Sequence, residues 1–67
     1  MMIKYDAQDD ILYAEFTRKP IVKDVSYGWN VNICYDANGI AEITILDAKV
    51  AGYWPLENAR DLLSMAA

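Results

Sequence analysis

The sequence predicts an α+β fold: an antiparallel β-sheet of four or five strands, arranged as a β-meander, with one C-terminal amphipathic helix packed on one face. Residues 2–46 contain short runs in which apolar and polar side chains alternate, which is the period of a half-buried strand. Residues 55–66 instead carry apolar side chains at helical spacing. The 67 residues are therefore expected to form a single small domain, with the sheet over about 2–46, a connector over 47–54 and the helix over about 55–66.

The stretch from Trp29 to Leu46 predicts the central β-hairpin. Asp36-Ala37-Asn38-Gly39 lies between two β-rich runs and has the polar start and the glycine that a tight turn requires. In the first run, alternation places on one face Trp29, Val31, Ile33 and Tyr35. In the second run, it places on one face Ala41, Ile43 and Ile45.

Three shorter strands are predicted before the hairpin, over residues 2–6, 11–17 and 21–27. The inward side chains of the second strand are expected to be Leu12, Ala14 and Phe16. Pro20 separates the second strand from the third, because proline has no N–H for the strand ladder. The third strand is predicted to lie at an edge of the sheet, since the charges of Lys23 and Asp24 discourage pairing with another chain.

After the hairpin, residues 47–52 predict a connector with one helical turn that ends at Gly52. Pro55 suits the first position of a helix, and Glu57 lies in the first turn, where the helix dipole favours an anion. The apolar stripe of this helix consists of Leu56, Ala59, Leu62, Leu63 and Ala66. We expect the stripe to cover apolar residues of the sheet.

The small size of the chain predicts self-association. A domain of this length buries only about 60 % of the surface that its unfolded chain exposes, so its stability is marginal unless something reinforces it. The single cysteine, Cys34, cannot form an internal disulfide, and the chain has no histidine for a zinc site. Five Tyr and two Trp are more large rings than one small core readily encloses. We therefore predict a homodimer.

The charge of the chain limits its partners. Ten acidic and six basic residues give a formal net charge of −4, without a basic cluster. This charge argues against binding to nucleic acid and to anionic membrane surfaces, both of which attract Lys and Arg, whereas it is compatible with a basic protein partner. The N-terminal residues contain no apolar run long enough for a signal peptide or a membrane span, so we expect a cytoplasmic location.

Four segments occur in an order typical of one known family: Ile3-Lys4-Tyr5-Asp6, Asp10-Ile11-Leu12-Tyr13, Tyr35-Asp36-Ala37-Asn38-Gly39 and Ile43-Thr44-Ile45-Leu46-Asp47-Ala48. Through them, residues 2–48 resemble the small bacterial domain-of-unknown-function family 2283. The chain carries Glu42-Ile43-Thr44 where a Gly-Ile-Glu run is common, so it has no carboxylate at position 44. The resemblance implies a compact β-rich domain without established catalytic residues. Because such proteins are sometimes encoded beside small toxin-like proteins, the resemblance also implies an antitoxin-like role.

Asp6, Asp9 and Asp10 are a candidate metal site, because carboxylate oxygens suit Ca²⁺ and Mg²⁺. A calcium loop needs a longer series of ligands that ends in a bidentate glutamate, and aspartate is also favoured in turns. A solvated turn is therefore the main interpretation. The alternative is a small metal-dependent enzyme or enzyme subunit that uses the Asp6, Asp9 and Asp10 cluster.

Two further candidates concern catalysis. Glu15 and Glu42 can share general acid and base work if the strands place them side by side, although charges on a sheet face are more often only solvated. Cys34 has no histidine in the chain to lower its pKa, so we interpret it as a half-buried structural residue.

An aromatic set is the least ordinary feature of the sequence: Tyr27, Trp29, Tyr53 and Trp54. Such rings occur both in cores and at protein interfaces, and both interpretations stay open. With Asp9 and Asp10 as carboxylates at the rim, these four rings form the predicted partner-binding site. The predicted function is a non-enzymatic, antitoxin-like protein-interaction module that binds a basic partner and needs no cofactor or metal.

Overall fold

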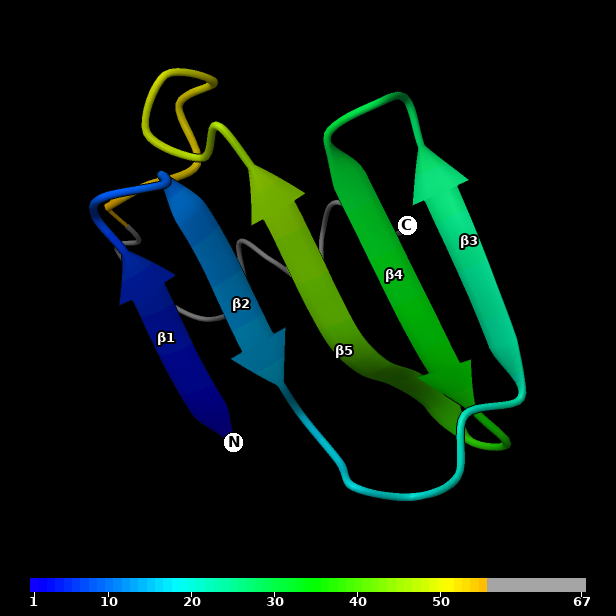
Figure 1. Cartoon of the computed structure of the whole chain (residues 1–67). Coiled ribbons are helices and arrows are strands. Elements are labelled where there is room, and N and C mark those ends of the chain that lie inside the picture. The colour runs from blue at the N-terminus through cyan, green and yellow to red at the C-terminus, as the bar shows by residue number, and fades with distance from the viewer. Residues whose placement is uncertain (56–67) are drawn as a thin grey trace.

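The computed structural model describes residues 1–55, which form one five-stranded antiparallel sheet (Figure 1). The strands are β1 (Met2–Asp6), β2 (Ile11–Glu15), β3 (Lys23–Tyr27), β4 (Val31–Asp36) and β5 (Gly39–Leu46). Their order across the sheet is β1-β2-β5-β4-β3. The predicted central hairpin is confirmed as β4 and β5, and β3 is confirmed as an edge strand.

The predicted β-meander is wrong, because β2 pairs with β5 and not with β3. Leu12 lies opposite Ile45 and Ala14 lies opposite Ile43, so this pairing joins the apolar faces of two strands. The Ala41 carbonyl extends the contact by accepting hydrogen bonds from the N–H groups of Phe16 (2.7 Å) and Thr17 (3.3 Å). Residues 16–22 then carry the chain past the ends of β5 and β4 to the far edge of the sheet (Figure 1).

The α+β class is also wrong for the described chain, because residues 1–55 contain five strands and no helix. Most of the predicted helix, residues 56–66, lies outside the described residues, and Pro55 itself lies in a bend. The predicted connector is a turn in which the Ala51 N–H donates to the Asp47 carbonyl at 2.9 Å, as in a single turn of helix. Within residues 1–55, no helix has the length and apolar character needed to cross a bilayer.

The core lies on one face of the sheet. Its largest fully buried side chains come from the three central strands: Leu12, Ile33, Ile43 and Ile45. Ile43 lies between Ala14 of β2 and Ile33 of β4 in the strand register. Partly buried side chains packed against this core include Tyr5, Phe16, Tyr53 and Trp54. The inward side of β2 is thus as predicted, with Leu12 and Ala14 buried and Phe16 half-buried.

Asp36 is the one buried charged residue in the described chain, with 5 % of its surface exposed. Its Oδ1 accepts a hydrogen bond from the Asn38 N–H at 2.7 Å, and its Oδ2 accepts one from the Thr17 hydroxyl at 2.7 Å. The Thr17 hydroxyl and then the Asn38 N–H lower the pKa of the Asp36 carboxyl, because both donate to the ionised form. Asp36 therefore fixes the β4–β5 turn and also attaches it to the segment after β2.

Candidate functional site

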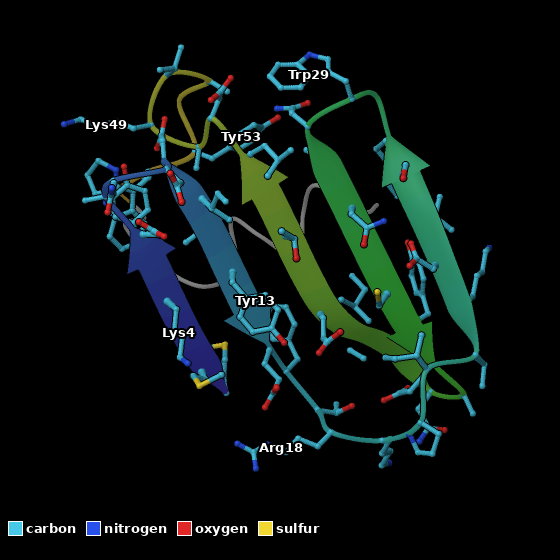
Figure 2. All side chains as sticks on the ribbon, in the orientation of Figure 1. Lys4, Tyr13, Arg18, Trp29, Lys49 and Tyr53 are labelled. Carbon is cyan, nitrogen blue, oxygen red and sulfur yellow. The ribbon has the colours of Figure 1, made fainter. Side chains whose placement is uncertain are left out.

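The face of the sheet opposite the core is polar, and one row across it is acidic. Glu15 lies opposite Glu42, Glu42 lies opposite Cys34, and Cys34 lies opposite Asp24. We call these four residues, from β2, β5, β4 and β3, the carboxylate row. Figure 2 shows Tyr13 of β2 on this face, with Lys4 beside it on β1 and Arg18 beyond the end of β2. The structure thus places Glu15 and Glu42 side by side, as the acid–base hypothesis requires.

Hydrogen bonds join the two glutamates through one phenol. The Tyr13 hydroxyl donates to Oε1 of Glu42 at 2.6 Å, and Oε2 of Glu15 lies 3.4 Å from the same hydroxyl. Arg18 forms a salt bridge with Glu15, with a distance of 2.8 Å between Nε and Oε1. Two like charges directly opposite each other on a sheet are destabilising, so Tyr13 and Arg18 offset a repulsion that the strand register imposes.

The protonation states of this face follow from the same contacts. The hydrogen bond to Glu42, followed by burial, strongly raises the pKa of Tyr13, so its phenol is neutral and acts as a donor. The hydrogen bond from Arg18 lowers the pKa of Glu15. Glu15 is therefore ionised at neutral pH and is not a reservoir of protons for general acid catalysis. The arrangement presents carboxylate oxygens as hydrogen-bond acceptors.

Cys34 lies among acceptors and is not activated as a nucleophile. Burial and then the charges of Asp24 and Glu42 raise the pKa of its thiol, so the unpaired, half-buried thiol is protonated at neutral pH. Its Sγ donates to the Asn32 side-chain oxygen at 3.6 Å, and the Asn32 amide donates to Oδ1 of Asp24 at 2.5 Å. Asn32 thus connects β3 and β4 on the polar face and orients one carboxylate of the row.

The three aspartates near the N-terminus have separate roles. Oδ1 of Asp6 accepts hydrogen bonds from the N–H groups of Gln8 (3.0 Å) and Asp9 (3.2 Å), which is an Asx turn. Asp9 is exposed. Within residues 1–55, no group of three or more His, Cys, Asp or Glu side chains is placed to hold a metal ion.

Asp10 connects the β1–β2 turn to the loop after β5. Its Oδ1 accepts hydrogen bonds from the Tyr5 hydroxyl (2.7 Å) and the Lys49 N–H (2.8 Å). Its Oδ2 accepts a longer one from the Val50 N–H (3.3 Å), and its backbone φ is +54°. Asp and Asn are the residues that most readily adopt this left-handed conformation besides glycine. The predicted rim carboxylate is therefore occupied by intramolecular contacts.

Asp10→Ala is expected to destabilise the protein more than Asp10→Asn, since asparagine keeps the left-handed backbone and one acceptor oxygen. The Lys49 N–H and then the Tyr5 hydroxyl lower the pKa of Asp10. A carboxyl whose pKa is lower in the folded chain adds stability above its unfolded pKa, and that stability is lost as pH falls through the folded pKa.

The contribution of Asp10 should therefore be complete at neutral pH and decline below about pH 4. Thermal melts from pH 7 to pH 2.5 measure this dependence, with Asp9→Asn as the control in the same turn. Equal melting temperatures for the wild type and Asp10→Ala at neutral pH contradict the role given to Asp10.

The predicted aromatic set divides between the two edges of the sheet. Trp54 stacks on Tyr5 of β1, with 4.5 Å between the ring centroids and 12° between the planes, and Tyr53 packs against the core. Tyr27 lies on β3, the opposite edge strand, and its hydroxyl is 2.9 Å from that of Tyr35.

Trp29 lies in the β3–β4 turn and is 73 % exposed, so the strand that was predicted to begin at Trp29 begins only at Val31 (Figure 2). The structure does not gather the four rings on one surface, and Trp29 is the most exposed of them.

Two roles on the polar face and at the loops were missed by the sequence reasoning. Tyr13 has a detectable signal, because alternation in β2 places it on the same face as Glu15. No signal in the sequence indicates that Asp10 binds the loop after β5, since its partner Lys49 is 39 positions away in the chain.

These features define a small single-sheet β protein with an apolar face and a polar face that carries the carboxylate row. The chain belongs to DUF2283, a family described as protein of unknown function, whose family model matches residues 2–49. The resemblance inferred from the sequence is thus confirmed. Comparisons with curated proteins and with solved structures found no match.

Proposed function

We propose that the protein is a non-enzymatic, cytoplasmic, antitoxin-like interaction module that binds a basic protein partner through the polar face of its sheet. The observation that carries this proposal is the uneven neutralisation of the carboxylate row. Within residues 1–55, Glu15 has a salt bridge with Arg18, whereas Glu42 has no salt bridge and accepts a hydrogen bond from the neutral Tyr13 hydroxyl. An arginine or lysine of the partner would form the ion pair that Glu42 lacks.

The neighbours of Glu42 favour a charged contact over a catalytic one. Asp24 lies two positions along the same row and is exposed, so a cation near Glu42 is also attracted by a second carboxylate. Tyr13 is neutral and holds the Glu42 carboxylate in one orientation, which reduces the entropy lost when a partner binds. The net charge of −4 adds long-range attraction for a basic protein.

The structure changes which residues we assign to the contact. Asp10 and Trp54 make intramolecular contacts with Lys49 and Tyr5, so they are poor candidates for direct binding. Trp29 is the most exposed ring of the predicted set and is the candidate aromatic anchor. Glu42 and Asp24 replace Asp10 as the candidate acidic residues.

The test begins with affinity capture from the native cell at low salt, using the wild type and Glu42→Lys as baits. A basic protein should be retained by the wild type and lost from Glu42→Lys. With the purified partner, Glu42→Gln should slow association by roughly two- to tenfold and flatten its salt dependence, because opposite charge steers the encounter.

Asp47→Asn is the matched control, since it removes the same charge from an exposed loop and asparagine tolerates the φ of +52° at this position. Equal effects of Glu42→Gln and Asp47→Asn on association would show that net charge alone acts, and not the carboxylate row. Retention of the same proteins by both baits contradicts the proposal.

A further inference from the structure

The outer edge of β3 has a defined pattern of backbone groups. The Asn30 carbonyl accepts a hydrogen bond from the Leu46 N–H at 2.8 Å, so Asn30 directs its backbone groups toward β5. Because these directions alternate along a strand, Ile33 directs its groups toward β3 and pairs with Val25. Asp24 and Ser26, on either side of Val25, therefore direct their N–H and C=O groups away from the sheet.

We propose that β3 pairs with β3 of a second copy of this chain, antiparallel, about a two-fold axis through Val25. Two Asp24–Ser26 pairs would then exchange four backbone hydrogen bonds across the axis, two for each pair. The two sheets would join into one of ten strands, in which both β3 edges are covered. This inference involves Asp24 of the carboxylate row, but it does not depend on the proposed function.

The residues of β3 fit this register. In a two-fold antiparallel pair centred on Val25, Asp24 faces Ser26 of the second copy on the polar face, and Lys23 faces Tyr27. A carboxylate meets a hydroxyl, and a cation meets an aromatic ring, which are favourable cross-strand pairs. No two like charges lie opposite each other.

Other symmetric registers are worse. The two-fold axis has to pass through a residue of β3 for the apolar faces of the two sheets to lie on the same side. A shift of the register by one position would place the side chains of one strand on the opposite face. An axis through Asp24 places two carboxylates opposite each other, and an axis through Lys23 places two ammonium groups opposite each other. Both arrangements are destabilising because the charges are alike. An axis through Ser26 pairs only three of the five strand residues. The charges of Lys23 and Asp24 thus discourage pairing in these other registers, as expected for an edge strand, and leave the register centred on Val25.

The other edge of the sheet does not offer this symmetry. The middle residue of β1 is Lys4, so full-length pairing of two β1 strands places Lys4 opposite Lys4. The β3 edge also has exposed apolar neighbours, Ile21 (44 % exposed) and Val22 (67 %), that a second copy would shield from water. Self-pairing is therefore favoured at β3 over β1.

The test is sedimentation of the full chain over a concentration series, which should show a reversible dimer. Ser26→Pro removes an outward N–H from each copy without removing a hydrogen bond to β4, as proline permits at an edge strand. It should raise the dissociation constant of the dimer about tenfold or more. Ile3→Pro is the matched control, since Ile3 is the corresponding outward residue of β1 by the same alternation.

A cysteine variant tests the same register without proline, so the test still holds if the proline variants misfold. With Cys34 replaced by Ser, Val25→Cys should form a disulfide-linked dimer on oxidation, because the two central residues of a non-hydrogen-bonded pair lie close enough for a disulfide. Ser26→Cys in the same background should not, since its counterpart is offset by two residues. A monomer at every concentration, dissociation by Ile3→Pro instead of Ser26→Pro, or equal cross-linking at positions 25 and 26 overturns the proposal.

Discussion

Ile43→Ala is expected to lower the free energy of unfolding by about 2–5 kcal/mol, the cost of removing a large buried side chain and leaving a cavity. Ile43 lies on the central strand β5, is 1 % exposed and is flanked by Ala14 and Ile33. So small a domain has little stability in reserve. Chemical denaturation measured by circular dichroism should therefore show a large loss or an unfolded chain at room temperature.

The matched control for Ile43→Ala is Val50→Ala, which also shortens a β-branched apolar side chain. Val50 is 86 % exposed, so its truncation should change the free energy of unfolding by less than about 0.5 kcal/mol. Similar losses for the two variants would mean that the buried face of the sheet is not the main source of stability.

Gly39→Val is expected to cost about 1–3 kcal/mol, because the backbone φ of Gly39 is +147°, a conformation that residues with a β-carbon rarely adopt. No atom lies within 4 Å of a β-carbon placed there, so the cost comes from the backbone and not from a clash. Valine is a demanding replacement, since its branched β-carbon restricts the backbone further.

Ala37→Val is the control for Gly39→Val, because Ala37 is exposed in the same turn and has no positive φ. It should leave the midpoint of thermal unfolding nearly unchanged. If Gly39→Val also melts at the wild-type temperature, the turn is able to adopt another geometry and Asp36 alone holds the hairpin.

The two faces of the sheet separate stability from the proposed function. Ile43 and its neighbours contribute through the removal of apolar surface from water, which requires no particular partner. Glu15 and Glu42, on the opposite face, lie directly opposite each other and repel, which lowers stability in the isolated chain. An incoming cation would convert this repulsion into attraction. Variants of the carboxylate row should therefore change binding without unfolding the protein.

The sequence by itself determined the local elements of this protein. The β4–β5 turn follows from Asp36 and Gly39, because a short polar side chain that bonds the turn backbone and a residue without a β-carbon act over only a few positions. The buried sides of β2 and β5 follow from the two-residue period of a strand. The homodimer, the cytoplasmic location and the basic partner are predictions from composition and charge.

Only the tertiary structure decided how these elements combine. Alternation in β2 predicts which side chains are buried but not which strand lies beside them, so the meander was a wrong choice among orders that bury the same residues. Trp29 was misplaced because the pattern of β4 continues into a turn. The contact of Asp10 with Lys49 depends on residues 39 positions apart, which meet only after the sheet has formed. Local rules act along the chain, whereas pairing and the sharing of a carboxylate depend on what the completed fold brings together.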